Sequence, residues 1–101
     1  MNSKERHQLK AQLIETGLWK GDEPGDPTVD LEAAKVLEFR ASEKARVRMV
    51  GFSVAEAGSG ASSINGIAIF RQEELLLKVT GNTYAEAICF AVVALTALLQ
   101  N

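Results

Sequence analysis

The chain has 101 residues, of which 47% are hydrophobic and 24% are charged, which is the composition of one globular domain with enough apolar residues to form a core. Its net charge of −2 argues against general binding to nucleic acids or acidic membranes, because both require a concentrated basic surface. The single cysteine cannot form an intrachain disulfide, and residues 1–25 lack the pattern of a secretory signal, so we expect a cytoplasmic protein.

Residues 1–20 are predicted to form an N-terminal helix and a hydrophobic clamp on its end. The helix spans about residues 4–16, with Ser3 as its N-cap and Gly17 as the residue that ends it. Leu18 and Trp19 would then pack against the end of this helix. Residues 21–27 are rich in glycine, proline and acidic residues, which predicts a surface linker.

Residues 28–101 are expected to form the core of the single domain. Residues 30–37 favour a helix, with Asp26, Thr28 or Asp30 as its cap. Residues 35–45 contain strong helix formers, but apolar and polar residues also alternate there as in a strand. Both interpretations of this segment stay open.

Three strands are predicted next, over residues 46–54, 64–71 and 75–80, from their alternation and their β-branched residues. In the first strand, we interpret Gly51 as a bulge that turns three apolar neighbours toward the core: Val50, Phe52 and Val54. The predicted fold class is α+β, with a short antiparallel sheet of three or four strands packed against helices.

The last predicted helix begins after Thr83, which forms a capping box with Glu86. No charged residue occurs from Ala87 to Leu99, and the apolar residues lie on every side of this helix. A helix of this kind must be buried all round, so we expect it to be central in the fold and covered by a second subunit, most simply in a dimer. The expected oligomer interface consists of Phe90, Val93, Leu95, Leu98 and Leu99.

The same apolar run does not predict a membrane anchor. It is about 13 residues long, whereas a membrane-spanning helix needs roughly 20.

Two segments resemble a small family of phage proteins, the phage ABA-sandwich domain. Residues 81–89, of sequence GNTYAEAIC, are similar to the start of that family's apolar C-terminal helix, and residues 30–36, DLEAAKV, to its first helix. The family often has a basic residue after the cysteine, where this chain has Phe90. The resemblance implies a virus-encoded accessory protein, and because the family has no assigned activity, no functional residue carries over.

The sequence contains no group of residues that indicates catalysis or a cofactor. Cys89 lies in the apolar helix and His7 is the only histidine, so a buried structural cysteine is expected. Histidine and cysteine are too few for a metal site. We therefore expect a protein that is not an enzyme and holds no metal or cofactor.

Candidate binding residues form two groups. Arg40, Arg46 and Arg48 fall close together, and paired arginines suit a phosphate or carboxylate, although ion pairs with nearby glutamates are the alternative. The loop at residues 58–63 would add hydroxyl donors from Ser59, Ser62 and Ser63. Trp19 is either a contact residue for a partner or a cover for the end of the first helix.

These residues support two functions. The first is a small interaction protein, such as a phage-encoded accessory factor or inhibitor that binds a host protein. The alternative is a module that sequesters a phosphorylated small molecule or nucleotide signal through Arg46, Arg48 and the loop. The helix–strands–helix order is also similar to the double-stranded-RNA fold, but the last helix lacks that fold's Lys-rich start, so nucleic acid is not the expected partner.

Overall fold

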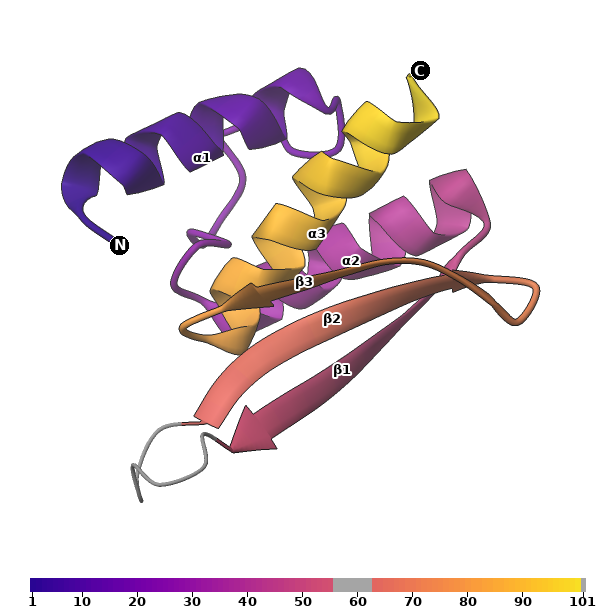
Figure 1. The fold of residues 1–101 in the computed structure, drawn as a ribbon. Helices are drawn as coiled ribbons and strands as arrows, with labels where there is room; N and C mark the ends of the chain where they lie inside the picture. The colour runs from indigo at the N-terminus through magenta and orange to yellow at the C-terminus, as the bar shows by residue number, and fades with distance from the viewer. Residues whose placement is uncertain (56–62, 101) are drawn as a thin grey trace.

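A computed structural model describes residues 1–55 and 63–100 of the chain (Figure 1). This part contains three helices and three strands, and the fold is α+β as the sequence predicts. The elements follow the order α1 (Ser3–Glu15), α2 (Leu31–Ala45), β1 (Arg48–Ala55), β2 (Ser63–Arg71), β3 (Glu74–Gly81) and α3 (Tyr84–Leu99).

The strands form one antiparallel sheet in the order β1-β2-β3. Helices α2 and α3 cover one face of the sheet, and α1 lies across α3 on the side away from the sheet (Figure 1). On the covered face, Ile67 and Ile69 of β2 are almost fully buried, as the alternation of β2 predicts. The molecule thus has three layers, and the core lies between the sheet and the two helices that cover it.

Side-chain caps fix where each helix begins. Asn2 accepts a hydrogen bond from the Glu5 backbone N–H at 2.8 Å, so the first cap is Asn2 and not the expected Ser3. Asp30 caps α2, and Thr83 accepts from the Glu86 N–H at 3.1 Å, as predicted. Each such cap contributes about 1 kcal/mol to stability.

Residues 35–45 belong to α2, which settles the open choice between helix and strand. Ala34, Leu37 and Ala41 recur at helical spacing and form the buried side of α2. Phe39, which alternated with polar neighbours as in a strand, is 65% exposed on the outer side of the helix.

The prediction for β1 placed its apolar side chains on the wrong face. The register of β1 and β2 runs without a shift from Arg48–Phe70 to Ala55–Ser63, so Gly51 is not at a bulge. Gly51 instead faces the helices, where an added Cβ would lie 2.9 Å from the ring of Tyr84 at the start of α3. Because side chains alternate along a strand, the neighbours of Gly51 point away from the helices.

Much of helix α3 is buried within a single chain. It contacts β2, β3, α2 and α1. Helix α1 covers part of the surface of α3 for which the sequence predicted cover by a second subunit. Leu95 is only 2% exposed, so its assignment to an oligomer interface is wrong. Val93 is partly buried, and three members of that predicted interface remain exposed: Phe90, Leu98 and Leu99. Among the described residues, no helix combines the length and apolarity that crossing a bilayer requires.

Ion pairs attach the segment between α1 and α2 to both helices. The Lys10 ammonium lies 2.8 Å from the Asp26 carboxylate, and the Arg40 guanidinium donates to both oxygens of Glu23 at 2.6 and 3.0 Å. Arg40 also donates to the Leu18 carbonyl at 2.8 Å. Arg40 is therefore engaged within the chain, which removes it from the predicted binding residues.

Leu95→Ala should lower the free energy of unfolding by about 2–5 kcal/mol, because it leaves a cavity in the core. The matched control is Leu98→Ala on the same helix, where the side chain is 45% exposed and the loss should stay below about 1 kcal/mol. Urea unfolding followed by circular dichroism measures both. Equal losses would contradict the placement of Leu95 in the core.

The Glu23–Arg40 pair should make stability depend on pH. The hydrogen bond from Arg40 lowers the pKa of Glu23 from 4.5 to about 2. Because the folded pKa is depressed, the contribution of the carboxylate is complete above the unfolded pKa and is lost as pH falls from 4.5 toward about 2.

The difference in unfolding free energy between the wild type and Glu23→Gln should therefore shrink over that pH range, since other carboxylates cancel in the difference. Urea midpoints at a series of pH values measure it. A difference that stays constant down to about pH 2 would show that Arg40 does not hold Glu23 in its ionised form.

Candidate functional site

The sheet has one face that no helix of the described part covers (Figure 1). The strand register arranges its side chains in four rows across the strands, and we call this surface the open face. The rows are Arg48, Phe70 and Leu75; Val50, Ala68 and Lys78; Phe52, Gly66 and Thr80; and Val54 with Ile64.

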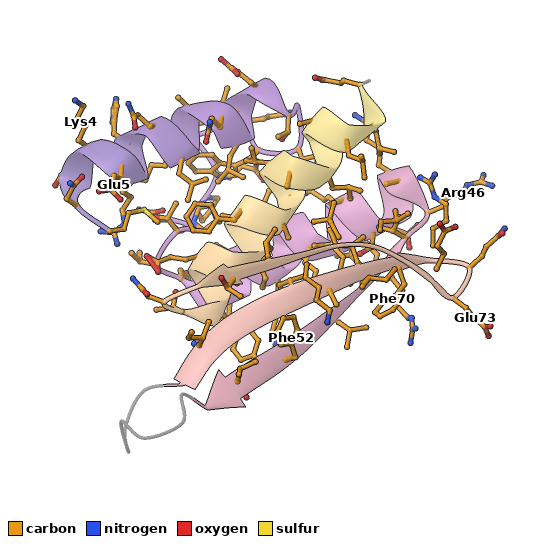
Figure 2. All side chains as sticks on the ribbon, viewed as in Figure 1. Lys4, Glu5, Arg46, Phe52, Phe70 and Glu73 are labelled. Atoms are coloured by element: carbon orange, nitrogen blue, oxygen red, sulfur yellow. The ribbon has the colours of Figure 1, made fainter. Side chains whose placement is uncertain are left out.

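Most side chains of the open face are apolar. Val54 and Leu75 are among the exposed large hydrophobic residues of the chain, and Val50, Ile64 and Phe70 are partly exposed. Figure 2 shows the labelled Phe52 and Phe70 on the side of the sheet away from the helices. The strands are thus apolar on both faces, although only one face contributes to the core.

Two aromatic rings give the open face its shape. The ring of Phe52 reaches from β1 over Gly66 of β2, where an added Cβ would collide with it. The Lys78 ammonium of β3 lies 5.8 Å from the centroid of this ring, and the Arg48 guanidinium lies 5.0 Å from that of Phe70. Cation–π contacts at exposed sites contribute about 0.5–1 kcal/mol each, so they hold these cations against the rings.

The open face is positively charged although the chain is negative overall. Its charged side chains are Arg48 and Lys78, and its rows contain no carboxylate. Glu74 pairs with Arg71 of β2. Arg71 is two residues after the buried Ile69, so this pair lies on the helix side of the sheet and not on the open face. A partner on the open face would therefore meet apolar side chains and two cations.

Of the arginine and serine residues predicted to share a site, the described ones, Arg46, Arg48 and Ser63, are not brought together. Arg46 ends α2 in a left-handed conformation, with φ of 55°, so it shares no strand face with Arg48. Arg48 begins β1, whereas Ser63 of β2 pairs with Ala55 at the other end of β1, and that strand is about 23 Å long at 3.3 Å per residue. Ser59 and Ser62 lie outside the described residues. This separation contradicts a phosphate site that combines Arg48 with Ser63.

The remaining predicted contact residue, Trp19, is buried in the hydrophobic core, so it is not a surface anchor. Leu99 lines a crevice of about 160 Å³ between the ends of the three helices, with Lys44 at its border. Pockets that enclose small ligands are usually larger, at about 300–1,000 Å³.

The described residues favour a structural role for the cysteine. The Cys89 thiol donates to the Pro27 carbonyl at 3.2 Å, and burial raises its pKa to about 12. The thiol thus stays protonated near neutral pH and is a poor nucleophile. No cluster of three or more metal-ligating side chains occurs within the described ranges.

The sequence interpretation missed Phe52, Phe70 and Lys78 as candidate binding residues. It placed Phe52 in the core because β1 has its larger apolar residues at even positions. A signal was present in β2, where residues 64–70 are apolar at both odd and even positions apart from Asn65 and Gly66. Such a run is typical of a strand that is covered on both faces.

The comparisons with known proteins identify no relative. No family model matches the chain, and no curated protein or solved structure gives a significant match.

The contact between Phe52 and Gly66 can be tested with a double-mutant cycle. Gly66→Ala should push the Phe52 ring off the sheet, whereas in a Phe52→Leu background the new methyl meets a smaller side chain. We expect Gly66→Ala to cost at least about 0.5 kcal/mol less in the Phe52→Leu background. Phe70→Leu is the control, because Phe70 lies two rows away, and urea unfolding measures all variants. Equal costs in all backgrounds would show that Phe52 does not lie over Gly66.

Proposed function

We propose that the protein is a small non-enzymatic interaction protein that binds a segment of another protein on the open face. The observation that carries this proposal is the apolar character of a sheet face that lies opposite the core and has no cover within the described part. From the strand spacing and the rise per residue, the face measures roughly 15 Å by 25 Å. Exposed apolar patches of a few hundred Å² often mark binding sites.

The shape of the face favours a protein segment over a small molecule. It is a sheet surface with rings lying along it. A pocket of about 320 Å³ includes Ile64 and Thr80 of its rows, but its other lining residues lie outside the open face: Met1, Glu5, Gly81, Asn82, Glu86 and Phe90. Small ligands are usually held in concave pockets that bury most of their surface. A flat apolar surface gains its binding energy by excluding water over an extended contact.

The resemblance of residues 81–89 to the phage ABA-sandwich domain supports a virus-encoded protein as the source of such a function. In that setting, we propose an accessory factor or inhibitor that binds a host protein in the cytoplasm. Binding alone would suffice for this role, which agrees with the protonated, buried thiol of Cys89.

A photo-crosslinking experiment tests the proposal. A benzoylphenylalanine placed at Val54, which is 50% exposed on the open face, is compared with one at Val36, which is 48% exposed on α2. In an extract of the cells that make the protein, position 54 should give a discrete protein adduct and position 36 should not.

Unlabelled wild-type protein should compete for this adduct, and a folded Phe70→Ser variant should compete at least about tenfold less well, because a buried aromatic contact contributes more than 1 kcal/mol to binding. Equal labelling from both positions, or competition that does not depend on Phe70, would contradict binding through the open face.

A further inference from the structure

We infer that the partner segment is an acidic amphipathic helix that lies along the strands of the open face. This inference rests on the proposed function and specifies the chemistry of its partner. Three features support it: the dimensions of the face, the position of its cations and the properties of the other occupants.

The dimensions of the open face match one helix. Four rows spaced by about 7 Å extend over about 20 Å, which corresponds to about 14 residues of α-helix at 1.5 Å per residue. The outer strands are about 10 Å apart, close to the diameter of a helix. A helix is also the element that covers the other face of this sheet, so a second one would complete a common arrangement of layers.

The cations come from the two edge strands, and their charged ends reach toward the aromatic rings of the face. Arg48 is on β1 in the first row, and Lys78 is on β3 in the second. A helix centred over β2 would contact Val50, Phe52 and Phe70, and it would cover the charged ends of Arg48 and Lys78 beside the two rings. Covering the cations without a counter-charge would cost free energy, so carboxylates are expected beside the apolar stripe of this helix.

A second copy of the chain fits the open face less well. Two open faces packed together would bring four cations into one interface, while their rows supply no carboxylate. The area is also smaller than the roughly 800 Å² that each partner usually contributes to a stable complex.

A single-stranded nucleic acid is also disfavoured. Aromatic rings beside cations can stack bases, but the aliphatic side chains outnumber the rings here. These are Val50, Val54, Ile64 and Leu75. Two cations would neutralise only about two phosphates, which gives weak binding at physiological salt.

The test uses two designed helical peptides of about 14 residues that share one apolar stripe. One carries glutamate on both sides of the stripe and the other carries lysine. Fluorescence anisotropy measures their affinity for the full chain, for the Arg48→Glu/Lys78→Glu variant and for a control, Lys4→Glu/Lys35→Glu. The control makes the same change in net charge on α1 and α2, away from the open face.

We expect the glutamate peptide to bind the wild type at least about tenfold more tightly than the lysine peptide. The Arg48→Glu/Lys78→Glu variant should reverse this preference, and the control should retain it. A Phe70→Ser variant should weaken the binding of both peptides, since both use the apolar stripe.

Other results would overturn the inference in distinguishable ways. Equal binding of both peptides that still depends on Phe70 would refute the acidic partner but leave the proposed function standing. Tighter binding of oligouridine, or a dimer in light scattering that Arg48→Glu/Lys78→Glu alters, would replace the helix with RNA or a second copy. Binding of neither peptide, together with no Val54 adduct, would refute the proposed function as well.

Discussion

Helix α3 has apolar side chains on every side, and enclosing it requires the sheet, α2 and α1 together. This requirement decides where the other helices lie. Helix α2 packs beside α3, and α1 packs on top of α3 instead of crossing to the other side of the sheet (Figure 1). The described part therefore has no helix left for the second face of the sheet, although that face is also apolar. The open face is a direct consequence of how α3 is buried.

The same packing determines which cations of the chain pair with carboxylates and which remain on the open face. The segment between α1 and α2 carries much of the acidic excess, and its Glu23 and Asp26 pair with Arg40 and Lys10. These pairs link α1 and α2 through the segment between them, and they occupy two cations that would otherwise be available to a ligand. The cations on the open face are held instead against aromatic rings, where their charge remains available to a partner. The overall charge of −2 thus conceals a small positive surface.

Local patterns predicted the elements of this fold better than the faces they present. The Thr83 cap, the end of α1 at Gly17 and the buried Ile67 and Ile69 all follow from rules that involve neighbouring residues only. The end of α2 could not be predicted because Arg46 adopts a left-handed conformation, which glycine usually adopts in that position.

The candidate site could not be predicted because its strands are apolar at both odd and even positions. Which face of β1 turns inward depends on Tyr84, whose ring needs the space beside Gly51. That contact joins residues far apart in the sequence, so the alternation of β1 alone does not reveal it. The same limit applies to Leu95, whose burial depends on how the helices pack around α3.

The central claim is that the open face is uncovered and is the surface that a partner contacts. Methyl NMR during a titration with the glutamate peptide tests it most directly. We expect the methyl signals of Val50, Val54, Ile64 and Leu75 to shift most, while those of Ile67 and Ile69 on the covered face shift far less. Shifts centred on Val36 of α2 or Leu98 of α3, with the open-face methyls unchanged, would contradict it.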